Sequence, residues 1–166
     1  MEEIIDLFVN TNDKKFMFDL GRLFASGKKI RILNKEEVEK NIEEEKKLGY
    51  AKSFNMMIKY WEQEELAPNI YSQKDKNKMF LICPVRNATF EEIKKLESTI
   101  RKYESKGYKV HYPERDTNQD PHVNGVNTGG FNICLENARA LASSSNIAIF
   151  YNKKSTGSMF DLGVTY

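Results

Sequence analysis

A short polar segment near the C-terminus carries the residues best suited to chemistry. Ser155, Thr156, Gly157 and Ser158 precede an acid, Asp161, at helical spacing. Hydroxyls and backbone N–H groups at the start of a helix bind anions, phosphate in particular, because those N–H groups have no helical acceptor. The alternative is that Ser158 caps the helix while Asp161 stabilises the helix dipole. The segment predicts an anion-binding site or a capped helix start.

Further polar residues follow apolar runs that read as strands. Arg86 and Asn87 come after the run at 79–83, and Arg115 and Asp116 come after the run at 108–112. In an α/β sheet the ligand crevice lies beyond the carboxyl ends of the strands, so these residues are candidates for substrate binding. An arginine there can pair with a phosphate or a carboxylate. The alternatives are an exposed surface arginine at 86 and a local ion pair between Arg115 and Asp116.

The phrase Met-Phe-Asp-Leu-Gly occurs twice, at residues 17–21 and again at 159–163, 142 residues apart. Each copy reads as a strand, a polar loop and a helix that opens on an acid. The loops differ, because Lys14, Lys15 and Phe16 stand where the second copy has Thr156, Gly157 and Ser158. We therefore expect the C-terminal copy to hold the site and the N-terminal copy to serve as scaffold.

Strands alternate with helices along the chain, which predicts a doubly wound α/β fold with a mainly parallel sheet of about five strands and helices on both faces. A flavodoxin-like strand order is the default for so few strands. We expect an N-terminal βαβ-helical segment at 1–75, which packs into or completes the sheet, and an α/β core at 76–166. The expected strands are 4–9, 29–33, 79–83, 108–112 and 147–151; the expected helices are 16–26, 35–65 with an interruption near Gly49, 89–106 and 131–143; and the expected loops are 67–78 and 114–130.

Composition limits the possible partners. The formal charge of +2 over 166 residues is too small to indicate nucleic acid or an anionic membrane as a partner. Cys83 and Cys134 lie in apolar contexts without metal-ligand spacing, which favours reduced, buried thiols over a disulfide. With neither a signal peptide nor a membrane-length apolar run, we expect a cytoplasmic protein. We also expect no metal and no cofactor.

Three segments of the chain together resemble the nucleoside 2-deoxyribosyltransferase superfamily, in particular a group of bacterial members whose activity is uncharacterised. The segments are residues 80–86, 111–119 and 155–163, and the resemblance covers about residues 78–166. It implies a flavodoxin-like fold and an enzyme that cleaves or transfers the N-glycosidic bond of a nucleoside or nucleoside 5′-monophosphate, in a homo-oligomer. A carboxylate nucleophile forms a covalent sugar–enzyme intermediate in this family, and Asp161 occupies its position.

The resemblance also implies roles for other residues. Arg86, Ser155 and Ser158 fall where nucleotide-cleaving members hold the 5′-phosphate, and Tyr112 or Tyr151 would lie near the sugar or base. The chain departs from the family pattern at Asp161, where glutamate is usual, and at Asn146, where an acid is common. A second hypothesis is therefore a nucleotide-binding module that has kept the pocket and lost the chemistry.

Residues 16–34 resemble the helix and strand that follow the nucleophile in the family. We expect the N-terminal segment to supply these elements, within one chain or by exchange between two subunits. The alternative is the remnant of a duplication that packs on the edge of the core.

Overall fold

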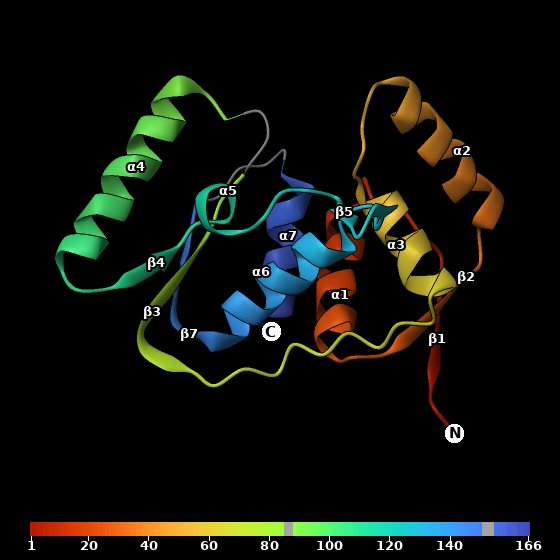
Figure 1. Ribbon diagram of the computed structural model, residues 1–166, viewed down its shortest axis with the longest axis horizontal. Helices are drawn as coiled ribbons and strands as arrows, with labels where there is room; N and C mark the ends of the chain where they lie inside the picture. The colour runs from red at the N-terminus through yellow and green to blue at the C-terminus, as the bar shows by residue number, and fades with distance from the viewer. Residues whose placement is uncertain (85–87, 151–154) are drawn as a thin grey trace.

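The computed structural model describes residues 1–84, 88–150 and 155–166, and its elements alternate as an α/β fold requires (Figure 1). Most expected elements are present within a few residues of their expected bounds. The elements are β1 (Ile4–Leu7), α1 (Lys14–Ala25), β2 (Lys29–Ile32), α2 (Lys35–Lys47), α3 (Phe54–Gln63), β3 (Asp75–Ile82), α4 (Phe90–Ser105), β4 (Lys109–His111), α5 (Pro113–Asp116), β5 (His122–Val123), β6 (Val126–Asn127), α6 (Phe131–Ser143), β7 (Ser144–Ile149) and α7 (Thr156–Val164).

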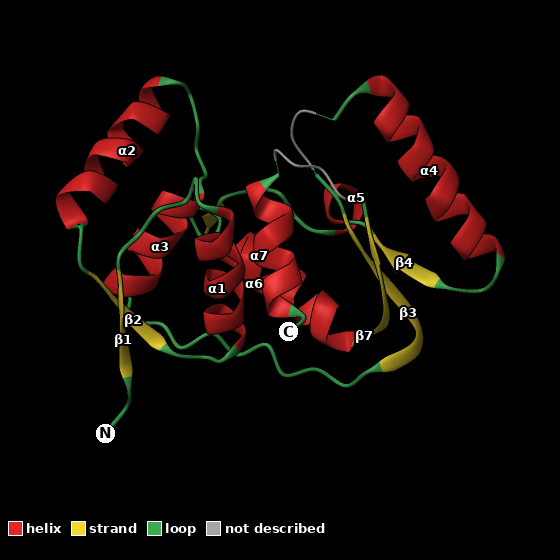
Figure 2. Ribbon diagram, turned by 180° about the vertical axis from the view of Figure 1, so that it is seen from behind, coloured by secondary structure: helices red, strands yellow, loops and turns green. Residues whose placement is uncertain are grey.

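The described residues contain five strands with parallel partners, but these strands are divided between two sheets. Strands β4, β3 and β7 form one sheet in that order, and β1 pairs with β2 in the other. The expected single sheet of about five strands is therefore wrong. The physical reason is a layer of helices, since α1, α6 and α7 lie between the two sheets in both views (Figures 1 and 2).

Strand β3 is the centre of the larger sheet, and helices cover both of its faces. Phe80 and Ile82 contribute to the core shared with α1, α3, α6 and α7, whereas Met79 and Leu81 pack in a second core with α4. Burial on both faces explains why this stretch is a continuous apolar run. The strand also begins earlier than expected, because Asp75 pairs with Ser144 at the start of β7, and the register shifts between this pair and the one at Met79.

The two copies of the repeat adopt the same local structure and pack against each other. Helices α1 and α7 begin at Lys14 and Thr156, 142 residues apart, and each is capped by the residue before it, Asp13 or Ser155. The helices touch through backbone atoms. A Cβ atom placed on Gly21 would lie 2.0 Å from the carbonyl oxygen of Phe160. This close approach joins the N-terminal segment to the rest of the molecule.

Helices α2 and α3 complete the N-terminal segment, and α3 packs against the start of α6. Ser53, the N-cap of α3, donates its backbone N–H to the carbonyl oxygen of Gly129 at 3.2 Å. Gly129 has φ +64, and a Cβ there would lie 2.4 Å from the backbone of Met56. The first turns of α3 and α6 are thus held side by side.

Candidate functional site

A cavity of about 380 Å³ lies beyond the carboxyl end of β3, and both parts of the chain line it. The core contributes Cys83, Asn137 and Asp161, and the N-terminal segment contributes Glu45 and Lys52. The volume falls within the range of small-molecule sites, about 300–1,000 Å³. The expected position of the crevice agrees with the structure. The share of its wall that comes from residues 45–57 did not follow from the sequence.

Asp161 lies in the second turn of α7 and forms part of the cavity wall. No residue within the described ranges forms a hydrogen bond or ion pair with its carboxylate that would offset the loss of hydration. Burial raises the pKa of Asp161 from 3.8 to about 7. A carboxyl group of this kind titrates near neutrality, where it can act as nucleophile, acid or base.

Ser155, Gly157 and Ser158 line the same cavity at the start of α7. The Ser155 hydroxyl accepts the backbone N–H of Ser158 at 3.2 Å, and the two serine Oγ atoms lie 2.8 Å apart. The segment therefore caps the helix and also lines the cavity. The capping residue is Ser155, where the sequence had suggested Ser158. The structure brings these three residues together with Asp161, as expected.

Asp19, the equivalent of Asp161 in the first repeat, has a different environment. Its carboxylate pairs with Lys15 at 2.8 Å, and its side chain is 48% exposed. Lys15 is the residue that replaces Gly157 in this copy. The two acids share a place in the repeat but not a chemical setting, which supports the second copy as the candidate site.

A polar cluster from the N-terminal segment forms one wall of the cavity. Glu45 accepts a hydrogen bond from the Ser53 hydroxyl and another from Asn55 Nδ2, the latter at 2.9 Å. Asn55 is 3% exposed and also donates to Thr11 Oγ1 at 3.2 Å. Its Oδ1 atom is buried without a hydrogen-bond partner in the described structure. The cluster fixes Glu45, Ser53 and Thr11 at the cavity surface.

Lys52 also comes from the N-terminal segment and lines the cavity. Its Nζ donates to the backbone oxygen of Gln119 at 3.2 Å and to the side-chain oxygen of Gln119 at 3.0 Å. Gln119 is in turn held by its Nε2 atom, which donates to the carbonyl oxygen of Pro113 at 2.9 Å. A cation is thus fixed at the cavity across the junction between the two parts of the chain.

Asn137 is placed at the cavity by a chain of buried hydrogen bonds. The Thr117 hydroxyl lies 2.6 Å from Asn137 Oδ1 and 2.9 Å from His111 Nε2. The ring of His111 stacks on Phe80 with the centroids 5.2 Å apart, and burial lowers the pKa of His111. With a neutral His111 that donates from Nε2, the Thr117 hydroxyl donates to Asn137 Oδ1 and leaves the Asn137 amide to donate elsewhere.

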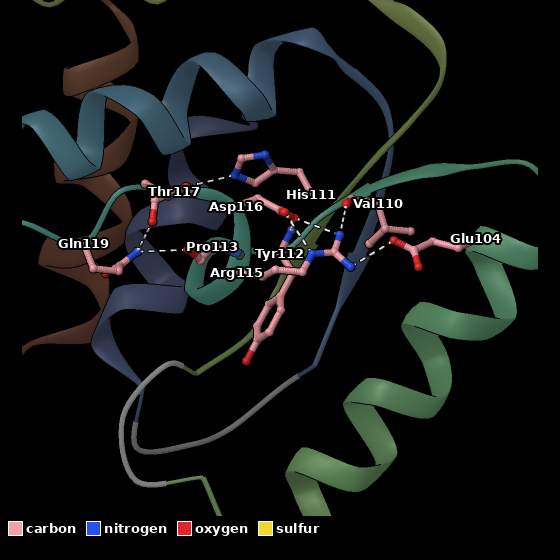
Figure 3. Close-up of polar contacts among 9 residues, drawn as sticks. All are labelled: Glu104, Val110, His111, Tyr112, Pro113, Arg115, Asp116, Thr117 and Gln119. Atoms are coloured by element: carbon pink, nitrogen blue, oxygen red, sulfur yellow. Dashed lines mark hydrogen bonds and ion pairs between the residues drawn. The ribbon is translucent and has the colours of Figure 1, made fainter.

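Tyr112, Arg115 and Asp116 lie outside the cavity lining, in a polar cluster of their own (Figure 3). Arg115 donates to Asp116, to Glu104 and to the carbonyl oxygen of Val110, and Asp116 accepts the backbone N–H of Tyr112 at 2.8 Å. Tyr112 is buried and its hydroxyl bonds to Glu114; burial and this bond raise its pKa. The local ion pair is therefore the interpretation of Arg115 and Asp116 that the structure shows.

Arg86, Asn87 and Tyr151, the other expected substrate-binding residues, lie outside the described residues. The two thiols lie inside them, and both line the cavity. Cys83 and Cys134 are free, and burial raises the pKa of Cys83 to about 12 and also raises that of Cys134. Across residues 1–84, 88–150 and 155–166, no group of three or more His, Cys, Asp or Glu side chains is arranged to hold a metal ion.

The cavity residues that were not predicted from the sequence include Lys52, Glu45 and Asn137. Lys52 and Glu45 belong to a charge-rich stretch that reads as a solvated helix surface, so no local pattern singles them out. Asn137 lies on α6 next to Glu136, which instead points outward and accepts the backbone N–H of Asn118. Asn137 follows Cys134 by three residues, so the two side chains lie on the same face of α6, and this spacing is the pattern that could have indicated Asn137.

None of the helices in the described part of the chain is both long and apolar enough to span a membrane. Comparison of the chain with protein-family models, with curated proteins and with solved structures gave no match.

Proposed function

We propose that this protein cleaves or transfers the N-glycosidic bond of a (deoxy)nucleoside or nucleoside 5′-monophosphate, with Asp161 as the nucleophile. The observation that carries this proposal is the Asp161 carboxylate, which lines a ligand-sized cavity and has no partner among the described residues to neutralise it. The resemblance to the nucleoside 2-deoxyribosyltransferase superfamily supplies the class of reaction.

In the proposed reaction the ionised carboxylate of Asp161 attacks the anomeric carbon of the sugar. The C1′–N bond breaks as the C1′–O bond to Asp161 forms, and the base leaves with the bonding electron pair and takes up a proton. Water, or a second base, then attacks C1′ and releases Asp161 as a carboxylate. Hydrolysis and transfer differ only in this second nucleophile.

The strand order supports a flavodoxin-like interpretation of the larger sheet. Among the strands of this sheet, β3 comes first along the chain, β4 second and β7 third. In the sheet they lie side by side in the order β4-β3-β7, so the first strand is in the middle. The flavodoxin-like order begins in this way, and its ligand site lies between the first and third strands. Cys83 follows β3 and Ser155 follows β7, and both line the cavity.

A nucleotide-binding module without chemistry is the second candidate, and the environment of Asp161 favours it in one respect. A pKa of about 7 leaves much of the carboxyl group protonated at neutral pH, and a protonated carboxyl group is not a nucleophile. The side chain is also one methylene shorter than glutamate, and attack geometry tolerates little error. Such a protein would bind its ligand at the same cavity and release it unchanged.

One experiment separates the two candidates. The protein is incubated with a panel of deoxynucleosides and their 5′-monophosphates, and free base is followed by chromatography. Base release that falls about a thousandfold or more in Asp161→Asn supports catalysis. Asp19→Asn, the same substitution in the other repeat copy, is the matched control and should retain activity. Tight binding without turnover, equal in the wild type and in Asp161→Asn, would leave only the binding module.

The proposal includes a cytoplasmic location and a homo-oligomeric state. The two cavity thiols support the location, because neither Cys83 nor Cys134 is paired in a disulfide and a reducing compartment keeps cysteines in that form. The oligomeric state rests on the family resemblance alone, and light scattering coupled to gel filtration measures it directly.

A further inference from the structure

Helix α3 brings an aromatic ring to the cavity, close to the helix that carries Asp161. Phe54, in the first turn of α3, lines the cavity, and its ring packs on that of Phe160 with the centroids 5.3 Å apart. A Cβ on Gly157 would lie 3.8 Å from Phe54 Cε2. Gly157 and Asp161 are four residues apart in α7, so they share one face of the helix about 5.4 Å apart along its axis. The Phe54 ring therefore lies about one helical turn from the candidate nucleophile.

This spacing indicates which part of the ligand meets Phe54. In the proposed reaction Asp161 attacks C1′ of the sugar, and the base is bonded to that same carbon. A 5′-phosphate is several bonds further away, at the other end of the sugar. Gly157 has no side chain, so the cavity wall between Asp161 and Phe54 is open to a flat group. Aromatic side chains stack on every nucleobase, because every base has a π-face, and Phe54 therefore suits the base.

The carboxylate of Glu45 lies beside this part of the cavity wall. One of its oxygens accepts a hydrogen bond from the hydroxyl of Ser53, and the other accepts one from Asn55 Nδ2 at 2.9 Å. Ser53 and Asn55 directly precede and follow Phe54, so the neighbours of the aromatic residue hold both carboxylate oxygens. A carboxylate oxygen can accept two hydrogen bonds, which leaves each Glu45 oxygen able to accept one from a ligand.

Asn55 fixes Glu45 at an energetic cost to the fold. The side chain is 3% exposed, and its Nδ2 donates to Glu45 and to Thr11 Oγ1, whereas its Oδ1 is buried without a partner in the described structure. A buried polar atom without a hydrogen bond destabilises the folded state. Both residues that Asn55 does contact line the cavity. A destabilising arrangement that positions a cavity carboxylate is the pattern expected of a functional site.

The edge of the base that Glu45 can accept follows from hydrogen-bond chemistry. A carboxylate with one open position on each oxygen binds two parallel N–H donors. Guanine presents such a pair in its ring N1–H and its 2-amino group, and hypoxanthine lacks the amino group. Adenine has an acceptor at N1, cytosine has one at N3, and the single ring N–H of uracil and thymine lies between two carbonyl oxygens. A carboxylate repels each of these acceptors, so guanine is the common base that matches both oxygens.

We propose that Phe54 and Glu45 form the base-binding subsite of the cavity, where the base stacks on Phe54 and Glu45 selects guanine. This inference rests on the proposed function for the position of the sugar at Asp161. It makes the N-terminal segment a working part of the site, because the segment supplies the residues that determine base specificity.

The first test measures kcat/KM for deoxyguanosine, deoxyinosine and deoxyadenosine. The wild type should prefer deoxyguanosine over deoxyinosine by about 10- to 100-fold, the range typical of one charge-assisted hydrogen bond. Glu45→Gln replaces one acceptor by a donor and so matches the amino group and N1 of adenine; its activity should fall with deoxyguanosine and rise with deoxyadenosine. A purely structural role of Glu45 would not reverse the preference. Glu44→Gln, at an exposed residue outside the cavity lining, is the control and should keep the wild-type ratios.

The second test removes the aromatic ring. Phe54→Leu should lower kcat/KM for all three nucleosides by about 10- to 100-fold, the typical contribution of base stacking, and leave their ratios within a factor of two. Phe90→Leu is the matched control, because Phe90 is also the first residue of a helix but is exposed and lies outside the cavity lining. An effect of Phe54→Leu on one base alone would contradict a stacking role.

A binding measurement keeps this inference separate from the catalytic proposal. The same nucleosides are titrated by calorimetry into Asp161→Asn, with and without Glu45→Gln. A preference for deoxyguanosine that requires Glu45, in a protein whose wild type releases no base, supports the inference and defeats only the glycosidase proposal. Base release with equal kcat/KM for deoxyguanosine and deoxyinosine overturns the inference and leaves the glycosidase proposal standing. If Glu45→Gln does not fold, as judged by circular dichroism, the ratio of these two nucleosides in the wild type still decides.

Discussion

Gly163 of α7 lies against the carbonyl oxygen of Phe18 in α1, so closely that a Cβ atom on the glycine would be 2.0 Å from that oxygen. Gly21 and Phe160 have the same relationship with the helices exchanged. The repeat places Phe and Gly three residues apart, on one face of each helix. Each copy therefore provides both a glycine and the carbonyl oxygen that the other copy's glycine contacts.

This contact predicts a large loss of stability from a single methyl group. Gly163→Ala should lower the free energy of unfolding by about 3 kcal/mol or more, because the obstacle is backbone and cannot rotate away. Gly157→Ala, in the same helix, is the control, since a Cβ there meets only Phe54 at an ordinary 3.8 Å. Urea denaturation measures both. Equal effects of the two substitutions would contradict the close approach.

The raised pKa of Asp161 predicts how stability depends on pH. Between pH 3.8 and about 7 the folded protein keeps a proton on Asp161 that the unfolded chain has lost. Unfolding then releases a proton, so the contribution of Asp161 to stability falls as the pH rises through this window. Asp161→Asn removes the penalty and should gain stability over the wild type between pH 5 and pH 8, up to a ceiling of about 4 kcal/mol.

Thermal or urea unfolding at several pH values checks this expectation. Partial access of water to the carboxylate reduces the gain below its ceiling. Asp19→Asn, at an exposed acid, should change stability by about 0.5 kcal/mol or less, as surface substitutions generally do. A difference between the wild type and Asp161→Asn that stays constant from pH 5 to pH 8 would show that the folded protein does not hold this proton.

The same group predicts the pH dependence of catalysis. A nucleophilic carboxylate must be ionised, so kcat/KM for base release should rise with pH and level off above the pKa of about 7. The profile is measured with one nucleoside and one monophosphate, because the phosphate itself titrates near pH 6. A rate that falls with increasing pH for both substrates would indicate that Asp161 acts in its protonated form instead.

Arg115 predicts a contrasting result, because it belongs to a structural cluster outside the cavity. Arg115→Met breaks the contacts with Glu104, Asp116 and the carbonyl oxygen of Val110, and should cost about 1 kcal/mol or less of stability, given its exposure. Monophosphate affinity, measured by titration calorimetry, should remain that of the wild type. A tenfold loss of affinity would return Arg115 to the substrate site.

Local signals in the sequence were sufficient to predict most of the elements. The capping box of Thr89 and Glu92 starts α4, and helix 131–143 has the expected bounds. The division into two sheets depends instead on the packing of α1 against α7. That contact joins backbone atoms of Gly163 and Phe18, and of Gly21 and Phe160, which lie far apart in the sequence, and no local pattern encodes it. The repeat was visible in the sequence, but the fact that its copies are each other's packing partners was not.

The candidate site was predicted in part for the same reason. Asp161 and the serines share one short segment, so their proximity follows from helical spacing. Lys52 reaches the cavity because Ser53 bonds to Gly129, a contact between residues far apart in sequence. Arg115 and Asp116 pair with each other outside the cavity lining, because residues at a strand end can satisfy one another as readily as they can bind a ligand.

The cavity lies at the junction between the N-terminal segment and the core. Ligand binding there is therefore linked to the free energy of unfolding of the whole molecule. A ligand that contacts residues of both parts of the chain would favour the folded state, in which the two parts are packed together, by mass action. Saturation at 100 times Kd should stabilise the protein by about 2.7 kcal/mol and shield the connection at residues 64–74 from proteases. The substrate would then contribute to the stability of the fold that binds it.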